Sequence, residues 1–136
     1  MIPRIRQVVL DTTDARALAE FYRKLFGLTY RRGDKAPPPG EPDPNGRDWL
    51  VLRNDNGMSL AFQQVDRLPR PTWPDPEVPQ QLHLDTTVPD VATLHEARDH
   101  ALALGAAQLD DRSEDPDEPL YVFADPMGHP FCIFVE

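Results

Sequence analysis

The stretch PQQLHLDTTVPD, residues 79–90, contains a string of four residues that the chain uses twice. The same string, LDTT, lies in IRQVVLDTTD, residues 5–14. In both places it belongs to a run with β-branched residues, typical of a strand, and an aspartate that can cap a helix follows it. His83 stands directly before the second copy, whereas a valine stands before the first. The repeat predicts one structural unit that occurs twice.

The rest of each half repeats in the same order. Apolar residues recur at helical spacing after Asp14 and after Asp90, and Gly27 and Gly105 are natural helix ends. A short strand, a loop rich in proline or acidic residues, and a strand–turn–strand segment follow in both halves. The elements expected are strands over 5–11, 28–32, 82–88 and 107–110, helices over 14–26 and 90–104, and hairpins within 49–65 and 120–136.

Two glycines align the hairpins. Gly57 lies in an Asn-Gly turn, and Gly128 lies 71 residues later in a similar setting. The chain is therefore expected to be a single domain, residues 1–136, of α+β class. It would contain two tandem βαβββ modules, about 4–65 and 80–136, with a proline-rich linker at about 66–79.

One module has a single amphipathic helix, so it cannot cover both faces of its sheet. The two modules are therefore expected to form a shared curved mixed sheet with the helices outside. Such a sheet has a concave inner face, and concave, partly apolar surfaces are where small ligands bind.

Composition narrows the class of partner. Lys and Arg number 14 against 23 Asp and Glu, a formal net charge of −9, which repels phosphate backbones and anionic lipid. No nucleic-acid or membrane partner is expected, and a neutral or cationic small molecule is compatible with the charge. A single cysteine excludes an internal disulfide, and no signal peptide or membrane span is recognisable, so a cytoplasmic location is expected.

The paired modules, with HLDTTVPD opening the second and DPMGHPFC near its end, resemble the vicinal oxygen chelate superfamily. That group includes glyoxalase I, the bleomycin-resistance proteins and the extradiol dioxygenases. The resemblance covers the whole chain and is greatest to a glyoxalase-like branch, through TWPDPEVPQQLHLD at the junction of the modules. It implies the fold given above and a homodimer. It does not imply one function, because this fold carries enzymes, drug-sequestering proteins and others.

The resemblance also implies where a metal would bind. Metal-dependent members hold a divalent ion with one residue from each of four strands, usually His or Glu. The matching positions here are Gln7, Ala61, His83 and Cys132. Alanine cannot be a ligand and glutamine is a weak one, whereas His83 and Cys132 favour a softer ion such as Zn²⁺. No metal cofactor is therefore predicted; if one were bound, it would be zinc held by His83, Cys132 and Gln7.

The first strand of one module can be aligned with the first strand of the other in two ways. Aligning the LDTT strings places Val9 opposite His83, and aligning the helix caps places Gln7 there. The two differ by two residues. Because side chains alternate along a strand, both versions put the same residues on the inner face.

That inner face is expected to line a ligand pocket. His83 is either a hydrogen-bonded strand residue or a neutral imidazole that accepts a proton from a ligand. Cys132 is expected to be a small buried apolar residue, since no cation adjoins it in sequence to activate the thiol. The pocket residues predicted are His83, Asp85, Gln7, Asp11, Gln63 and Cys132, with Trp73 near the mouth.

The function predicted is therefore that of a glyoxalase-like small-molecule binding protein with a degenerate metal site, which sequesters or senses a small aromatic or cationic compound. The alternative is a metal-dependent lyase, isomerase or dioxygenase of the same superfamily with an altered ligand set. A third possibility is a protein whose pocket is filled by its own side chains and which acts only through interactions. The sequence assigns no catalytic residue and does not decide whether the protein is an enzyme.

Overall fold

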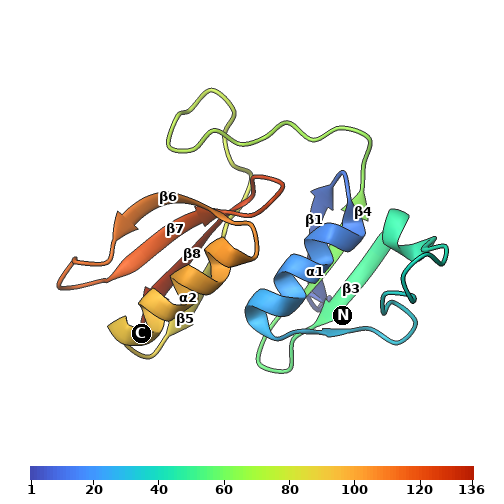
Figure 1. The fold of residues 1–136 in the computed structure, drawn as a ribbon, viewed down its shortest axis with the longest axis horizontal. Coiled ribbons are helices and arrows are strands. Elements are labelled where there is room, and N and C mark those ends of the chain that lie inside the picture. Colours follow the sequence, from blue (N-terminus) through green and yellow to red (C-terminus); the bar gives the residue numbers. More distant parts are fainter. The chain divides into compact units, whose positions relative to one another are not determined.

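The computed structural model describes residues 1–136 and divides into two compact units, 1–68 and 69–136 (Figure 1). Each unit contains one helix and four strands in the order βαβββ. The first comprises β1 (Gln7–Thr12), α1 (Ala15–Phe26), β2 (Thr29–Tyr30), the 3-10 turn η1 (Asn45–Arg47), β3 (Trp49–Arg53) and β4 (Ser59–Gln64). The second comprises β5 (Leu84–Val88), α2 (Val91–Ala103), β6 (Ala107–Arg112), β7 (Leu120–Ala124) and β8 (Pro130–Val135).

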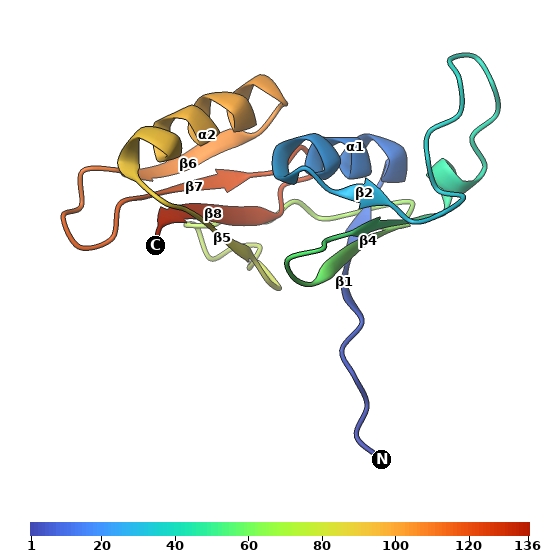
Figure 2. The same cartoon turned by 90° about the horizontal axis from the view of Figure 1, so that it is seen from below.

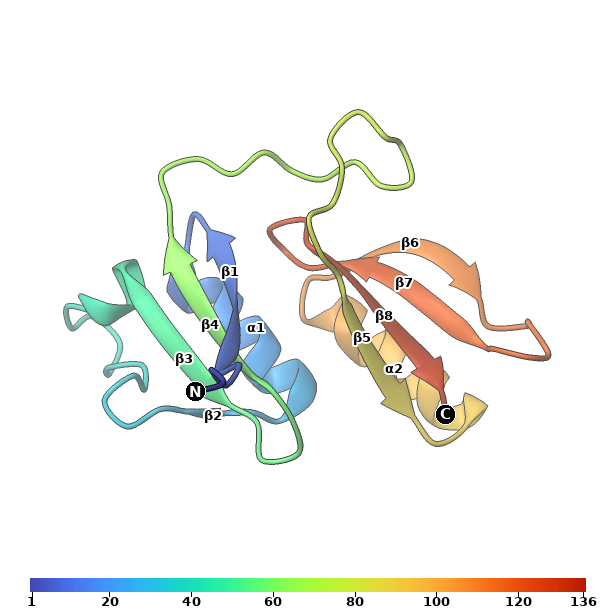
Figure 3. The ribbon, with the colours of Figure 1, turned by 180° about the vertical axis from the view of Figure 1, so that it is seen from behind.

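Each unit builds one four-stranded mixed sheet, visible in Figure 3. The strand order is β1-β4-β3-β2 in the first and β5-β8-β7-β6 in the second. The first strand of each unit pairs in parallel with the last, and the remaining pairs are antiparallel. The predicted α+β fold of two tandem βαβββ modules is confirmed.

The third predicted element of the first half is shorter than expected. Only Thr29 and Tyr30 pair with β3 as a strand, although a strand was expected over 28–32. The chain turns immediately afterwards, because Asp34 N–H donates to the carbonyl of Arg31 and Gly33 adopts a φ of +91°. The corresponding β6 continues to Arg112.

The helix starts are capped as predicted. The Asp14 carboxylate accepts a hydrogen bond from Ala17 N–H at 3.0 Å, and the Asp90 carboxylate accepts one from Thr93 N–H at 2.7 Å. Each such cap stabilises a helix by about 1 kcal/mol. Gln64 also accepts from Ala15 N–H at 3.1 Å, which ties the start of α1 to the end of β4.

Each helix covers one face of the sheet in its own unit (Figure 2). In the first unit the Tyr22 ring stacks on Phe62 with 5.9 Å between centroids, so Phe62 faces α1. Its strand partners Leu10 and Leu50 share that face and are fully or nearly fully buried.

In the second unit His95 on α2 lies 2.8 Å from the hydroxyl of Tyr121, which therefore faces the helix. Phe123 and Phe131 stack beside it at 5.1 Å. Burying each large aromatic side chain contributes about 1.5–3 kcal/mol. The opposite face of each sheet carries no helix of its unit and is called here the helix-free face.

The two hairpin turns are equivalent, as the glycine alignment predicts. Gly57 N–H donates to the carbonyl of Asn54, and Gly128 N–H donates to the carbonyl of Asp125. Only Gly128 has a left-handed backbone, with a φ of +98°. Neither helix of the structure has the length and apolar character needed to cross a bilayer.

Candidate functional site

The helix-free face of the first sheet carries the residues expected there. Leu10 faces α1, so alternation turns Val9 and Asp11 to the other side, together with Ala61 and Gln63, their partners on β4. Asp11 and Gln63 are exposed and Gln7 is half-buried. Ala61 is fully buried, so the space above its methyl group is not open to solvent.

The strand pairing decides between the two alignments of the modules. Val9 pairs with Ala61 in the first sheet, and Asp85 pairs with Cys132 in the second. Because Ala61 and Cys132 stand at the same distance after their turn glycines, Val9 corresponds to Asp85 and Gln7 to His83. The helix-cap alignment is therefore correct. The two LDTT strings are offset by two residues in the fold.

Three potential ligand groups meet on the helix-free face of the second sheet. His83 directly precedes β5, Asp85 lies in β5, and Cys132 lies beside it in β8. One donor atom from each of the three lies within 4.8 Å of the others. The His83 Nε2 atom is 3.3 Å from a carboxylate oxygen of Asp85. Here the sequence-based grouping of these three residues agrees with the geometry.

The thiol of this cluster is not activated. Burial raises the pKa of Cys132 to about 11, and the neighbouring Asp85 carboxylate contributes further to the rise. A thiol with this pKa is protonated near neutral pH, and the thiolate is the nucleophilic form. Cys132 therefore acts as a weak hydrogen-bond donor toward Asp85.

The imidazole of this cluster is oriented from both sides. Its Nδ1 atom lies 3.1 Å from the side-chain oxygen of Gln80, which accepts a hydrogen bond from Nδ1–H. Nε2, the other ring nitrogen, faces the Asp85 carboxylate. A carboxylate oxygen accepts hydrogen bonds only, so a donor group of a ligand at this place can bond to Asp85 and contact the ring.

The set of residues does not match the metal site that the resemblance implies. Ala61 has no donor atom in its side chain, and Gln7 offers only a neutral amide. The three better donors all belong to the second unit, and the thiol among them must lose a proton to bind a metal. An imidazole, a carboxylate and a thiol suit zinc better than Mg²⁺ or Mn²⁺.

The remaining predicted residues belong to the first unit or to the loop before β5. Trp73 is half-buried in a loop of the second unit that Thr72 closes through hydrogen bonds with Asp75 and Val78. Gln7 lines a hollow of about 300 Å³ in the first unit, together with Ser59 and Val51. That Gln7, Asp11, Gln63 and Trp73 line one pocket with the His83 cluster stays a prediction.

Sequence reasoning missed the cations around Gln7. Arg6, Arg31 and Arg53 line the same hollow, although they come from three separate segments. The signal was present in the composition of the two halves. Residues 1–68 contain 11 Lys and Arg against 9 Asp and Glu, whereas residues 69–136 contain 3 against 14.

Comparison with known proteins identifies the family to which this chain belongs. A model of a family described as the glyoxalase-like domain matches residues 7–134. The chain belongs to the glyoxalase-like domain family. This membership confirms the predicted relationship to the glyoxalase, bleomycin-resistance and dioxygenase superfamily, the vicinal oxygen chelate proteins. No curated protein matches the sequence.

Solved structures of glyoxalase-like proteins share the fold at low identity. A glyoxalase/bleomycin resistance protein/dioxygenase family enzyme from Burkholderia phytofirmans PsJN is similar at a TM-score of 0.70 and 16% identity, over 95% of each chain. A glyoxalase/dioxygenase from Nostoc punctiforme gives 0.70 and 20%, over 98% of this chain and 90% of the other. The fosfomycin resistance protein FosX from Mesorhizobium loti gives 0.69 and 12%, over 100% and 94%.

Proposed function

We propose that this glyoxalase-like protein binds a small organic molecule that carries a hydrogen-bond donor or a positive charge. The observation that carries the proposal is the convergence of His83, Asp85 and Cys132 on the helix-free face of the second sheet. His83 Nε2 and the Asp85 carboxylate face each other at 3.3 Å, and the carboxylate accepts an N–H or O–H group of a ligand favourably.

The charge of the second unit favours the same class of ligand. This unit carries 3 Lys and Arg against 14 Asp and Glu. A negative field concentrates cations near the surface and disfavours anions. Asp85 is more than half exposed, so its carboxylate is accessible to a ligand.

We further propose that the protein holds no resident metal at this site. The support comes from Gln7 and Ala61, which replace two of the four ligands that metal-dependent members use, and from a thiol that holds its proton near neutral pH. Without a metal, the cluster acts through hydrogen bonds and charge. The reaction chemistry of the superfamily is then not required of this chain, and binding is the activity expected.

One observation favours a second candidate function. Three donors within 4.8 Å are the number that a catalytic zinc site uses beside water. A metal-dependent lyase, isomerase or dioxygenase with this altered ligand set is therefore the alternative. Metal content separates it from the binding protein.

The binding proposal is tested with the cluster carboxylate. Small aromatic amines, benzylamine among them, are titrated into the protein while backbone amide shifts are followed by NMR. Shifts centred on residues 83–85 and 131–133 are expected, with affinity about tenfold weaker in Asp85→Asn. Asp99→Asn is the matched control, since it removes the same charge from an exposed site on α2. Equal affinity in both variants would place the ligand elsewhere and overturn the proposal.

A further inference from the structure

A second hollow lies on the helix side of the first unit, at the end of α1. Its volume is about 540 Å³, and residues of α1, β2 and the following loop line it. Four of the lining residues are basic: Arg23, Arg31, Arg32 and Lys35. Glu20 is the acidic residue among them, so the hollow is cationic in a chain whose formal net charge is −9.

Two of these cations are already paired and two are not. Arg23 binds the Glu20 carboxylate through two nitrogens, at 2.6 and 3.0 Å, and Arg31 pairs with Asp34 at 3.1 Å. Arg32 and Lys35 take part in no ion pair or hydrogen bond of their side chains. Both are exposed. The hollow therefore keeps two positive charges that no carboxylate of the protein neutralises.

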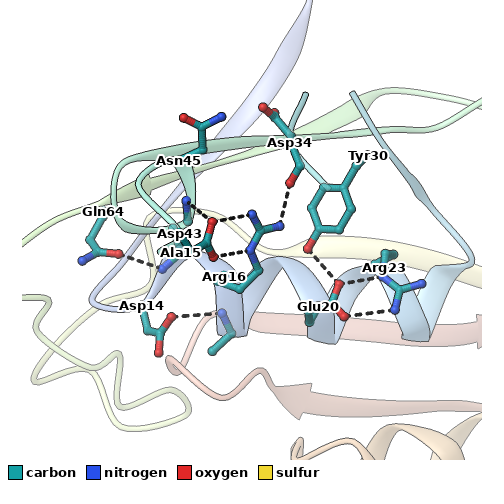
Figure 4. A network of polar contacts seen from close by, with 12 residues as sticks. Asp14, Ala15, Arg16, Glu20, Arg23, Tyr30, Asp34, Asp43, Asn45 and Gln64 are labelled. Carbon is teal, nitrogen blue, oxygen red and sulfur yellow. Dashed lines mark hydrogen bonds and ion pairs between the residues drawn. The ribbon is translucent and has the colours of Figure 1, made fainter. Parts of the chain in front are cut away.

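The loop that carries these cations is held in place by a network shown in Figure 4. Arg16 on α1 binds the Asp43 carboxylate through two nitrogens at 2.8 and 2.9 Å, and donates to the carbonyl of Asp34 at 2.6 Å. The Asp34 side chain is buried and accepts from Val51 N–H at 2.9 Å. Ordering the loop in the free protein lowers the entropic cost of binding there.

The hollow also has an apolar part. Leu28, which is buried, and Tyr30, which is aromatic, are among the residues that line it. The Tyr30 hydroxyl donates to Glu20 at 2.8 Å, and the Arg16 guanidinium lies 5.0 Å from the centre of its ring. These contacts fix the ring, so the hollow combines a rigid apolar wall with unpaired positive charge.

We propose that this hollow is a binding site for a small organic anion, a carboxylate or phosphate on an aromatic or short aliphatic body. Arg32 and Lys35 bind the anionic group, and Leu28 and Tyr30 contact the apolar body. The site is separate from the His83 cluster, and the proposal goes beyond the binding of donor or cationic compounds there. The acidic second unit repels an anion, whereas the unpaired cations of this hollow attract it.

The test uses phenyl phosphate as the probe and the full chain. Its binding is followed by NMR shifts of the backbone amides of residues 28–36, with benzyl alcohol as the neutral counterpart. Phenyl phosphate is expected to shift these amides and benzyl alcohol is not, because binding needs the attraction of the two cations in addition to the apolar contacts. Binding should weaken as salt is raised, since exposed charges are screened.

The variant Arg32→Gln/Lys35→Gln identifies the site. It is expected to fold normally, because both side chains are exposed and unpaired, and to bind phenyl phosphate about tenfold more weakly. Arg67→Gln/Arg47→Gln removes the same charge from the same unit outside the hollow and should bind as the parent does. If both double variants bound phenyl phosphate equally weakly, net charge alone would explain the loss of affinity. That result would overturn the proposal. So would inorganic phosphate binding as tightly as phenyl phosphate, or shifts confined to other residues.

Discussion

The first unit carries 11 Lys and Arg against 9 Asp and Glu, whereas the second carries 3 against 14. Both fold to the same βαβββ order with the same sheet topology, and both start their helix with a capping aspartate. Their helix-free faces differ, with Gln7 and Ala61 in the first where His83 and Cys132 stand in the second. Topology in this protein thus depends on caps, turns and buried apolar residues, while charge and ligand groups differ freely.

The difference in charge between the two units changes which ligands the net charge of the chain favours. A total of −9 favours a cationic partner when it is treated as a property of the whole molecule. Counted by unit, it comes entirely from the second, and the first is slightly basic. Each unit therefore attracts ligands of the charge opposite to its own, which is the basis of the two binding sites proposed.

Substituting the first residue of the hairpin turn is expected to reveal the largest difference between the two units in lost stability. Asp125 is fully buried and its carboxylate accepts from the amides of Met127 and His129 and contacts the His129 ring at 2.8 Å. Its counterpart Asn54 is part-exposed and accepts from Asn56 N–H. Asp125→Ala should lower the free energy of unfolding by about 3 kcal/mol, and Asn54→Ala by less than about 1 kcal/mol. Urea denaturation measures both, and equal losses would contradict the distinction.

Substituting the turn glycines is expected to give a smaller difference in lost stability between the two units. A Cβ at Gly128 would lie 2.5 Å from Cγ of Arg70, and the backbone there is left-handed. A Cβ at Gly57 would meet only the flexible side chain of Asn54 at 3.3 Å. Gly128→Ala should therefore cost about 1–2 kcal/mol of unfolding free energy, and Gly57→Ala about 0.5 kcal/mol or less. Thermal unfolding compares the two variants, and a larger loss at Gly57 would show that the turns differ from this description.

The loop network of the first unit makes a pH-dependent contribution. The hydrogen bond from Arg16 lowers the pKa of Asp43 below its ordinary value. A lowered folded-state pKa means that the stabilisation is present above the unfolded pKa, about 4, and is lost as pH falls through the folded value. Asp43→Asn should cost about 1 kcal/mol at pH 7 and progressively less below pH about 4. Urea denaturation across this range measures it, and a cost that does not change with pH would contradict the pairing.

The smallest effect is expected at the thiol of the second unit. Because the Asp85 carboxylate helps to raise the pKa of Cys132, Asp85→Asn should lower that pKa and speed alkylation by iodoacetamide at pH 8 by about threefold. Burial, the larger cause, is unchanged in the variant. Asp99→Asn serves again as the control. Slower alkylation in Asp85→Asn would mean that the carboxylate promotes thiolate formation.

Much of the fold could be predicted from the sequence because its signals are local. Asp14 and Asp90 mark helix starts, and Gly57 and Gly128 mark equivalent turns. Aligning the two modules on their LDTT strings gives the wrong match, offset by two residues. The hydrogen-bond register of each strand depends on its partner strand and not on the string itself. The short β2 depends on the turn at Gly33, where tertiary contacts of Asp34 override the strand pattern.

The candidate site was predictable only in part. Alternation along β5 and β8 placed Asp85 and Cys132 on one face with His83 nearby, and the structure brings them together. The hydrogen bond from His83 to Gln80 and the cationic hollow near Tyr30 depend on loop conformation, which residue spacing does not encode. The expected homodimer stays a prediction, for which light scattering is the direct measurement.

Zinc content tests the central claim most directly, that the ligand groups of the second unit act as a hydrogen-bonding cluster without a resident metal. The purified protein is incubated with excess zinc, dialysed against metal-free buffer and analysed for metal per chain beside His83→Ala. The account predicts far less than one zinc per chain, and the same content in the variant. About one zinc per chain, lost in His83→Ala, would contradict it and establish a metal site built from His83, Asp85 and Cys132.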